Sequence, residues 1–243
     1  MNAHYLLEIS VETLDAALAA ERGGAHRIEL CENLSVGGVT PRVELMHATR
    51  ERIKVPIYAM IRPRGGNFVY SAAEFSAMLR DIESAKTSGM DGVVLGILRE
   101  NRTVDRARTH ELVQAAKPLH VTFHRAFDES AGVFSALEDV IATGATCLLT
   151  SGGEPSAAQG EAILAELVHL AGDRLTILPG GGINPANLER IVQSTGAREF
   201  HSGLGTALPY SRTDHSQFER EVRKLAEIIE GLELASAGNS PRS

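Results

Sequence analysis

Charged and imidazole side chains stand at the ends of several short apolar runs in this 243-residue chain. Carboxylates and imidazoles exchange protons with substrates, and guanidinium groups bind carboxylates or phosphates. The candidates for proton exchange are Glu8, Glu29, His124 and His201. The candidates for holding a ligand are Arg62, Arg64, Arg125 and Ser151. Together they indicate an enzyme-like pocket with isomerase or lyase chemistry on a small anionic or sugar-like substrate.

The same charges allow a structural interpretation, in which Glu8 and Glu29 only neutralise Arg62 and Arg64. Buried ion pairs add little net stability because both partners lose their hydration. A cluster of charges at one end of a fold therefore favours a ligand site.

Two glycine-rich segments follow later apolar runs, at residues 179–183 and 201–206. Backbone N–H groups of such loops bind phosphate in many barrels, because glycine allows close approach of an anion. Gly181 and Gly182 are therefore further candidates for substrate contact. The alternative is that these glycines only form tight turns.

Metal ligands are a further possibility. Cys31 and Met60 occur in neighbouring apolar runs, and soft sulfur ligands select Cu(I). Ordinary packing of both side chains in the core is the simpler alternative. A divalent-metal site made by Glu29, His124 and His201 is also open.

Several reaction classes are disfavoured by the sequence. No lysine lies at the end of an apolar run, which argues against a Schiff-base aldolase. Neither a G-x-S-x-G nor an H-E-x-x-H motif is present, so the common signatures of serine hydrolases and zincins are missing.

The composition of the chain limits which partners and which cellular location we expect. The formal net charge is -7, and the chain has no run of lysine and arginine, so we expect no nucleic-acid partner. No stretch of 18 apolar residues and no signal-peptide pattern occurs, so we expect no membrane span and a cytoplasmic protein.

Eight apolar runs, each followed by a helix-like pattern, must position these side chains. They cover residues 6–10, 27–31, 57–62, 92–96, 120–125, 147–151, 175–179 and 199–203. A spacing of roughly 20–35 residues is typical of a (β/α)₈ barrel of the TIM type, whose chemistry lies at the carboxyl ends of its strands. We predict one α/β barrel domain over residues 1–235 and a disordered tail over residues 236–243.

Helix signals agree with this division. Apolar residues recur at helical spacing within 11–22, 71–88, 157–170, 185–193 and 217–233. Ser71 and Glu74 have the spacing of a capping box. Asn184 before Pro185 predicts an N-cap followed by a proline in the first helical position.

Alternation along each strand predicts which side chains enter the barrel, because successive side chains point to opposite faces. The residues placed inside are Glu8, Arg27, Glu29, Cys31, Tyr58, Met60, Arg62, Thr122, His124, Glu199 and His201, with Arg64 as a further candidate. The run 147–151 has no clear alternation, and the directions of Arg125 and Ser151 are left open.

Several longer motifs occur along the chain. The longest read IRPRGGNF over residues 61–68 and VTFHRAFD over residues 121–128. Shorter ones are RIELC at 27–31, GGVTP at 37–41, LTSG at 149–152 and FHS at 200–202. These motifs resemble those of the CutC copper-homeostasis family, and the resemblance covers nearly the whole chain.

Membership of this family implies a TIM-type barrel, a cytoplasmic homo-oligomer and a role in copper handling, with Cu(I) bound by cysteine. Cys31 matches the family motif and would be the main ligand, with Met60 or Cys147 beside it. Many relatives carry two adjacent cysteines where this chain has Ser10 and Val11. The sequence thus leaves two hypotheses open: a copper homeostasis protein that binds Cu(I), and a barrel enzyme.

Overall fold

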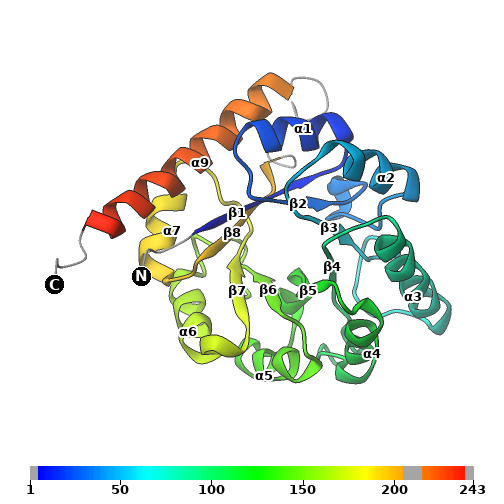
Figure 1. The fold of residues 1–243 in the computed structure, drawn as a ribbon. Coiled ribbons are helices and arrows are strands. Elements are labelled where there is room, and N and C mark those ends of the chain that lie inside the picture. Colours follow the sequence, from blue (N-terminus) through cyan, green and yellow to red (C-terminus); the bar gives the residue numbers. More distant parts are fainter. Residues whose placement is uncertain (1–4, 205–214, 239–243) are drawn as a thin grey trace.

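The computed structural model describes residues 5–204 and 215–238. Within them, parallel strands form a ring that is surrounded by helices (Figure 1). The strands are β1 (Leu6–Val11), β2 (Arg27–Leu30), β3 (Ile57–Met60), β4 (Gly92–Leu95), β5 (His120–Phe123), β6 (Cys147–Thr150), β7 (Thr176–Pro179) and β8 (Glu199–Ser202). Each lies within or overlaps one of the predicted runs, and the predicted TIM-type barrel is confirmed.

Helices alternate with these strands. They are α1 (Leu14–Arg22), α2 (Val43–Arg52), α3 (Ala72–Thr87), α4 (Arg106–Ala116), α5 (Val133–Thr143), α6 (Glu161–Ala171), α7 (Leu188–Thr195) and α9 (His215–Gly238). Short 3₁₀ helices are η1 (Leu34–Val36), η2 (Arg125–Glu129) and η3 (Gly172–Arg174). No helix of the described residues is long and apolar enough to cross a membrane.

The hydrogen-bonded strand order is β7-β6-β5-β4-β3-β2-β1-β8, with β8 also in contact with β7, which nearly closes the ring. The long helix α9 lies outside the ring and packs against α1, α7 and β1 (Figure 1). The barrel therefore brings the carboxyl ends of all these strands to one face.

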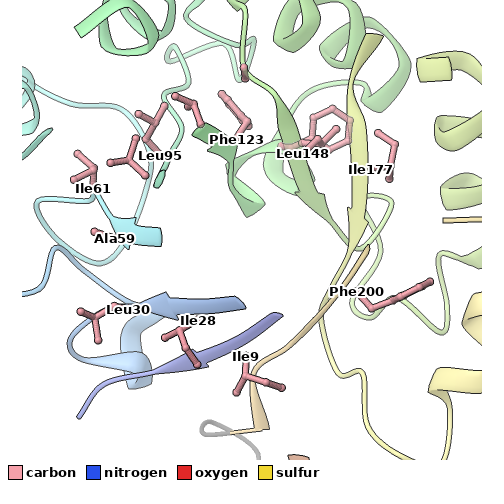
Figure 2. Packing of buried hydrophobic residues seen from close by; sticks show 14 of the residues in the cluster. Ile9, Ile28, Leu30, Ala59, Ile61, Leu95, Phe123, Leu148, Ile177 and Phe200 are labelled. Atoms are coloured by element: carbon pink, nitrogen blue, oxygen red, sulfur yellow. The ribbon is translucent and has the colours of Figure 1, made fainter. Parts of the chain in front are cut away.

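Outward-pointing side chains of the strands pack against the helices and form the main hydrophobic core. Figure 2 shows them in a ring, with Ile9, Ile28, Ile61, Phe123 and Phe200 among those labelled. This is the face that alternation assigned to them.

Inside the ring lie two separate apolar clusters. One contains Cys31, Leu34, Tyr58, Met60 and Val94, and the other contains Cys147, Leu149 and Leu178. Leu148 belongs to the outer core, so the β6 alternation that the sequence left open is now assigned: Cys147 and Leu149 face inward.

Two local predictions differ from the structure. Asn184 does not cap α7; its side chain accepts a hydrogen bond from Ala186 N at 2.9 Å within a turn, and the residue before the helix is Asn187. Helix α9 continues to Gly238, so the predicted tail begins within its last turn. Residues 239–243 lie outside the described residues.

The predicted capping box of α3 is present. Ser71 Oγ accepts a hydrogen bond from Glu74 N at 3.3 Å, and Glu74 Oε2 accepts one from Ser71 N at 2.7 Å. Two N–H groups that the helix itself cannot satisfy are thus paired.

Replacing the cap tests this assignment. We expect Ser71→Ala to lower the free energy of unfolding by about 1 kcal/mol, because the Glu74 N–H loses its acceptor. Urea denaturation measures the change. The control is Ser76→Ala, an exposed serine on the same helix, which should change stability by less than about 0.5 kcal/mol. Equal effects of the two substitutions would contradict the capping role.

Candidate functional site

A cavity of about 510 Å³ opens among the residues at the carboxyl ends of the strands. Eight of the residues singled out from the sequence line it: Glu29, Met60, Arg62, His124, Arg125, Gly181, Gly182 and His201. Other lining residues include Ser10, Leu34, Phe68, Leu149, Asp128, Glu129 and Asn184. Barrels place their ligand sites at this face, which makes the cavity the candidate site.

Its floor is an ionic layer set by strand register. Glu8 on β1 pairs in register with Arg27 on β2 and with His201 on β8. Arg27 Nε donates a hydrogen bond to Glu8 Oε2, and His201 Nδ1 lies 2.7 Å from Glu8 Oε1. Arg27 also contacts Glu199 at 2.9 Å and stacks over the ring of Tyr58 at 4.6 Å. Each carboxylate oxygen of the fully buried Glu8 therefore has a partner.

These contacts fix the charge states of the layer. Burial alone would raise the pKa of Glu8, but the attraction of Arg27 and the hydrogen bond from His201 outweigh it and lower the pKa to about 2. Burial would lower the pKa of His201, but the carboxylates of Glu29 and Glu8 raise it above its usual value. Glu8 thus holds the His201 ring by its Nδ1 side and leaves Nε2 facing Glu29.

Glu29 is the second buried carboxylate, and its environment is different. Its Oε2 lies 4.0 Å from His201 Nε2 and accepts a hydrogen bond from Cys31 Sγ at 3.9 Å. Burial raises the pKa of Glu29 to about 7, with the attraction of His201 opposing this and the repulsion of Glu8 adding to it. Two carboxylates with such different pKa values are a common arrangement of acid/base sites.

A possible site for a hard cation lies in the same place. Glu8, Glu29 and His201 offer ligand atoms within 4.8 Å of one another. This group differs from the set of Glu29, His124 and His201 considered from the sequence. Both oxygens of Glu8 are already engaged with Arg27 and His201, so an ion would have to displace one of these partners.

A second polar group follows the ends of β3 and β5. Arg62 donates from Nη1 to the carbonyls of Val36 and Gly38, at 2.9 and 3.0 Å, and from Nη2 to Gly66 at 2.8 Å. Its guanidinium lies 4.7 Å from the centre of the Phe68 ring. The ring of His124 packs on the same Phe68, with 4.9 Å between ring centres.

His124 follows β5 and caps η2. Its Nδ1 accepts a hydrogen bond from Ala126 N at 3.2 Å. Burial and the charge of Arg62 lower the pKa of His124 to about 3. Gly96 makes room for the ring, since a Cβ there would lie 2.6 Å from His124 Nδ1.

A third group lies beside the glycine-rich loop. Arg125 pairs with Asp128 at 2.7 Å and donates to Ser151 Oγ at 2.9 Å. Asp128 in turn accepts hydrogen bonds from Ser151 N and Gly153 N. Gly181 packs against Arg125, and a Cβ there would lie 3.3 Å from the guanidinium carbon. Both Gly181 and Gly182 have positive φ, of 98° and 76°, so they also form a turn that other residues rarely adopt.

Arg64 is not brought to the cavity. It pairs with Glu74 at 2.6 Å, and it donates hydrogen bonds to the carbonyls of Asn67 and Val69. It fixes the loop after β3 to the start of α3. The sequence places this residue after the strand has ended, where alternation no longer fixes direction.

The two sulfur residues lie together inside the barrel. Cys31 and Met60 belong to one buried cluster, and Gly38 packs against both. A Cβ at Gly38 would lie 3.2 Å from Cys31 Sγ and 3.6 Å from Met60 Cε. Burial and the nearby Glu29 raise the pKa of the Cys31 thiol well above its usual value. The second cysteine, Cys147, is buried in the other inner cluster.

Three residues of the site were not selected from the sequence. Arg27 was placed inside the barrel but given no role, although it neutralises Glu8. The structural alternative, in which Arg62 and Arg64 neutralise Glu8 and Glu29, therefore named the wrong arginines. Phe68 and Asp128 stand at the ends of the two longest motifs, which was the available signal for them.

Comparison with known proteins decides the family. The model of the CutC family matches residues 5–206. The chain belongs to the CutC family. A family protein CutC of Chromobacterium violaceum is 46% identical over 211 residues, covering 85% of each chain. The human protein named copper homeostasis protein cutC homolog is 43% identical over 197 residues, covering 81% of this chain and 72% of the human one.

A solved CutC structure supports the fold. The CutC protein of Streptococcus agalactiae superposes with a TM-score of 0.78 at 32% identity, covering 82% of this chain and 98% of that one. The matched range of the CutC family model includes every strand of the barrel described above. The cavity of this CutC chain therefore lies within the family domain.

Removing the Glu8 charge tests the ionic layer. We expect Glu8→Gln to lower the free energy of unfolding by about 3–5 kcal/mol, because it leaves Arg27 buried without its main counter-charge. The matched control is Glu199→Gln, which removes the partly exposed partner of Arg27 and should change stability by about 1 kcal/mol or less. Urea denaturation of both variants measures the difference.

The pH dependence of stability gives an independent check. The pKa of Glu8 in the folded protein lies below the ordinary 4.5, so its ionised form stabilises the fold above about pH 4.5. This contribution is lost as the pH falls toward 2. The Glu8→Gln variant should lack that part of the loss, and an unchanged acid transition would show that Glu8 is not held by these charges.

Proposed function

We propose that this chain acts in copper homeostasis and binds Cu(I) directly through Cys31 and Met60. The observation that carries the proposal is that both sulfur side chains lie beside Gly38 in one buried cluster, and that Met60 of this cluster lines the cavity. Membership of a family with relatives named for copper homeostasis supports the same role.

The donor set fits the chemistry of Cu(I). Thiolate and thioether sulfur are soft ligands that favour this ion over hard cations. Cys31 is fully buried and Met60 lines the cavity, so an ion that enters the cavity reaches the thioether first. The surrounding cluster of Leu34, Tyr58 and Val94 supplies an apolar shell, which disfavours hydrated ions.

The Cys31 thiol must lose its proton when it binds the metal. Its hydrogen bond runs to Glu29 Oε2 at 3.9 Å. The carboxylate and the sulfur therefore belong to one continuous site. Cys147 has no part in this arrangement, because it lies in the separate cluster with Leu149 and Leu178.

An anaerobic Cu(I) titration against a competing chelator tests the proposal. We expect the wild type to withdraw one equivalent of Cu(I), Cys31→Ser to lose this competition, and Met60→Leu to weaken it. Cys147→Ser is the matched control, since it removes the other buried thiol and should leave the affinity unchanged. Failure of the wild type to compete, or equal loss in both cysteine variants, would rule out the Cys31 site.

A further inference from the structure

Three buried polar atoms belong to residues of the cavity wall and have no hydrogen-bond partner among the described residues. They are Glu29 Oε1, Arg62 Nε and His124 Nε2. The three residues are 3%, 5% and 3% exposed. A buried polar atom without a partner costs roughly 1–3 kcal/mol, so native proteins seldom retain one without a reason. Three such atoms around one cavity point to a ligand that supplies their partners.

Two of the three atoms are hydrogen-bond donors. His124 Nδ1 accepts the Ala126 N–H, so a neutral ring carries its proton on Nε2. Burial and the charge of Arg62 keep the ring neutral by lowering its pKa to about 3. Arg62 is always protonated. Its contacts with backbone carbonyls engage Nη1 and Nη2, and its charge also acts on the buried Tyr70 hydroxyl, while Nε has no hydrogen-bond partner among the described residues.

The two donors are held on one support. The Phe68 ring contacts the Arg62 guanidinium at 4.7 Å and the His124 ring at 4.9 Å between centres. Neither side chain is free to turn, since Arg62 is tied to three carbonyls and His124 to a backbone N–H. A fixed pair of donors, one of them charged, is suited to an oxygen on which negative charge develops.

The third atom is an acceptor on Glu29, a residue that lines the same cavity from another strand. Glu29 extends from β2, whereas His124 follows β5 and Arg62 follows β3, so a ligand among them is contacted from several sides of the ring. Glu29 Oε2 is engaged with Cys31, while Oε1 has no partner within the described residues. A carboxylate oxygen that shares a cavity with two oxygen-binding donors can take a proton from a carbon next to a carbonyl group.

We propose that this cavity binds a small hydroxylated carbonyl compound and catalyses its enolisation, with Glu29 as the base and His124 and Arg62 as the donors to the carbonyl oxygen. Glu29 Oε1 takes the proton from the carbon adjacent to the carbonyl. The electron pair of that C–H bond forms a carbon–carbon double bond, and the carbonyl π pair moves to the oxygen. Return of the proton from Glu29 to carbon restores the carbonyl, and no oxidant, reductant or metal is consumed.

The polar side chains that line the cavity beyond Glu29, His124 and Arg62 favour a ligand with hydroxyl groups. Glu129 and Asn184 line the same cavity and carry hydrogen-bonding groups beyond the reacting carbonyl. The volume of about 510 Å³ accommodates a ligand of several carbons. In this arrangement His124 serves as a neutral donor and not as a base, unlike the role suggested by the sequence.

Hydrogen exchange at carbon is the direct test. The full chain, freed of metal with a chelator, is incubated in D₂O with hydroxyacetone and with dihydroxyacetone, and proton NMR follows deuterium entry next to the carbonyl. We expect the wild type to exceed buffer by about 100-fold or more, and Glu29→Gln to fall to the buffer rate. No exchange above buffer with either compound overturns the proposal.

Substitution of His124 separates the donor from a purely structural role. His124→Phe should lose about 10²–10³-fold in exchange rate, while His124→Gln, which retains an N–H, should recover part of it. Cys147→Ser is the control and should exchange like the wild type. Equal rates in the phenylalanine and glutamine variants overturn the donor role.

A measurement on the unmodified protein guards against variants that do not fold. In ¹⁵N-histidine-labelled wild type, the two-bond and three-bond couplings of His124 should show a neutral ring protonated on Nε2 from pH 5 to pH 8. A ring protonated on Nδ1, or charged at pH 6, contradicts the proposed site.

Discussion

The buried contact of Glu8 with Arg27 and His201 is the interaction on which the interior of this barrel depends. Ordinary barrel interiors are filled with layers of branched apolar side chains. Here the layer where β8, β1 and β2 meet contains an anion, a cation and an imidazole, all held by strand register. Because each charge is shielded from water, removing one of the three would leave the others without compensation. The layer therefore fixes the position of His201, and through it one side of Glu29.

Three polar groups surround the cavity, and they differ in how many of their polar atoms have hydrogen-bond partners. The ionic layer is closed, since both oxygens of Glu8 have partners. The group of Arg125, Asp128 and Ser151 is closed as well, and it fastens the loop after β6 to η2. Among the described residues that line the cavity, buried polar atoms without hydrogen-bond partners belong to Glu29, Arg62 and His124. This part of the cavity wall is therefore where a ligand would make hydrogen bonds.

The sequence could predict much of this arrangement because strand alternation is strict. It placed Glu8, Glu29, Cys31, Arg62 and His201 inside the barrel, and the structure has them buried there. It could not select partners, since pairing of side chains across strands depends on register, which puts Arg27 and not Arg62 beside Glu8.

Side-chain directions could not be predicted beyond the ends of the strands, because alternation no longer applies there. Arg64 follows a proline and precedes two glycines, and the loop turns its side chain toward Glu74. The inner residues of β6 could not be recognised, because Leu148 and Leu149 are equally apolar although one faces the helices and the other the interior. Asp128 was overlooked because its role depends on Arg125 and Ser151, which are brought together only in three dimensions.

Side chains on the inner face of β2 take part in both activities proposed for this protein, Cu(I) binding and enolisation. Arg27, Glu29 and Cys31 are two residues apart, so they point to the same side of the strand at successive heights. Arg27 neutralises Glu8 in the ionic layer, and Glu29 lines the cavity. Cys31 belongs to the buried cluster that contains Met60. Glu29 is thus shared: one oxygen accepts the thiol of Cys31, and the other is available to a ligand. A metal at Cys31 and a carbonyl compound in the cavity would meet at the same carboxylate, so neither could bind without altering the hydrogen bonding of the other.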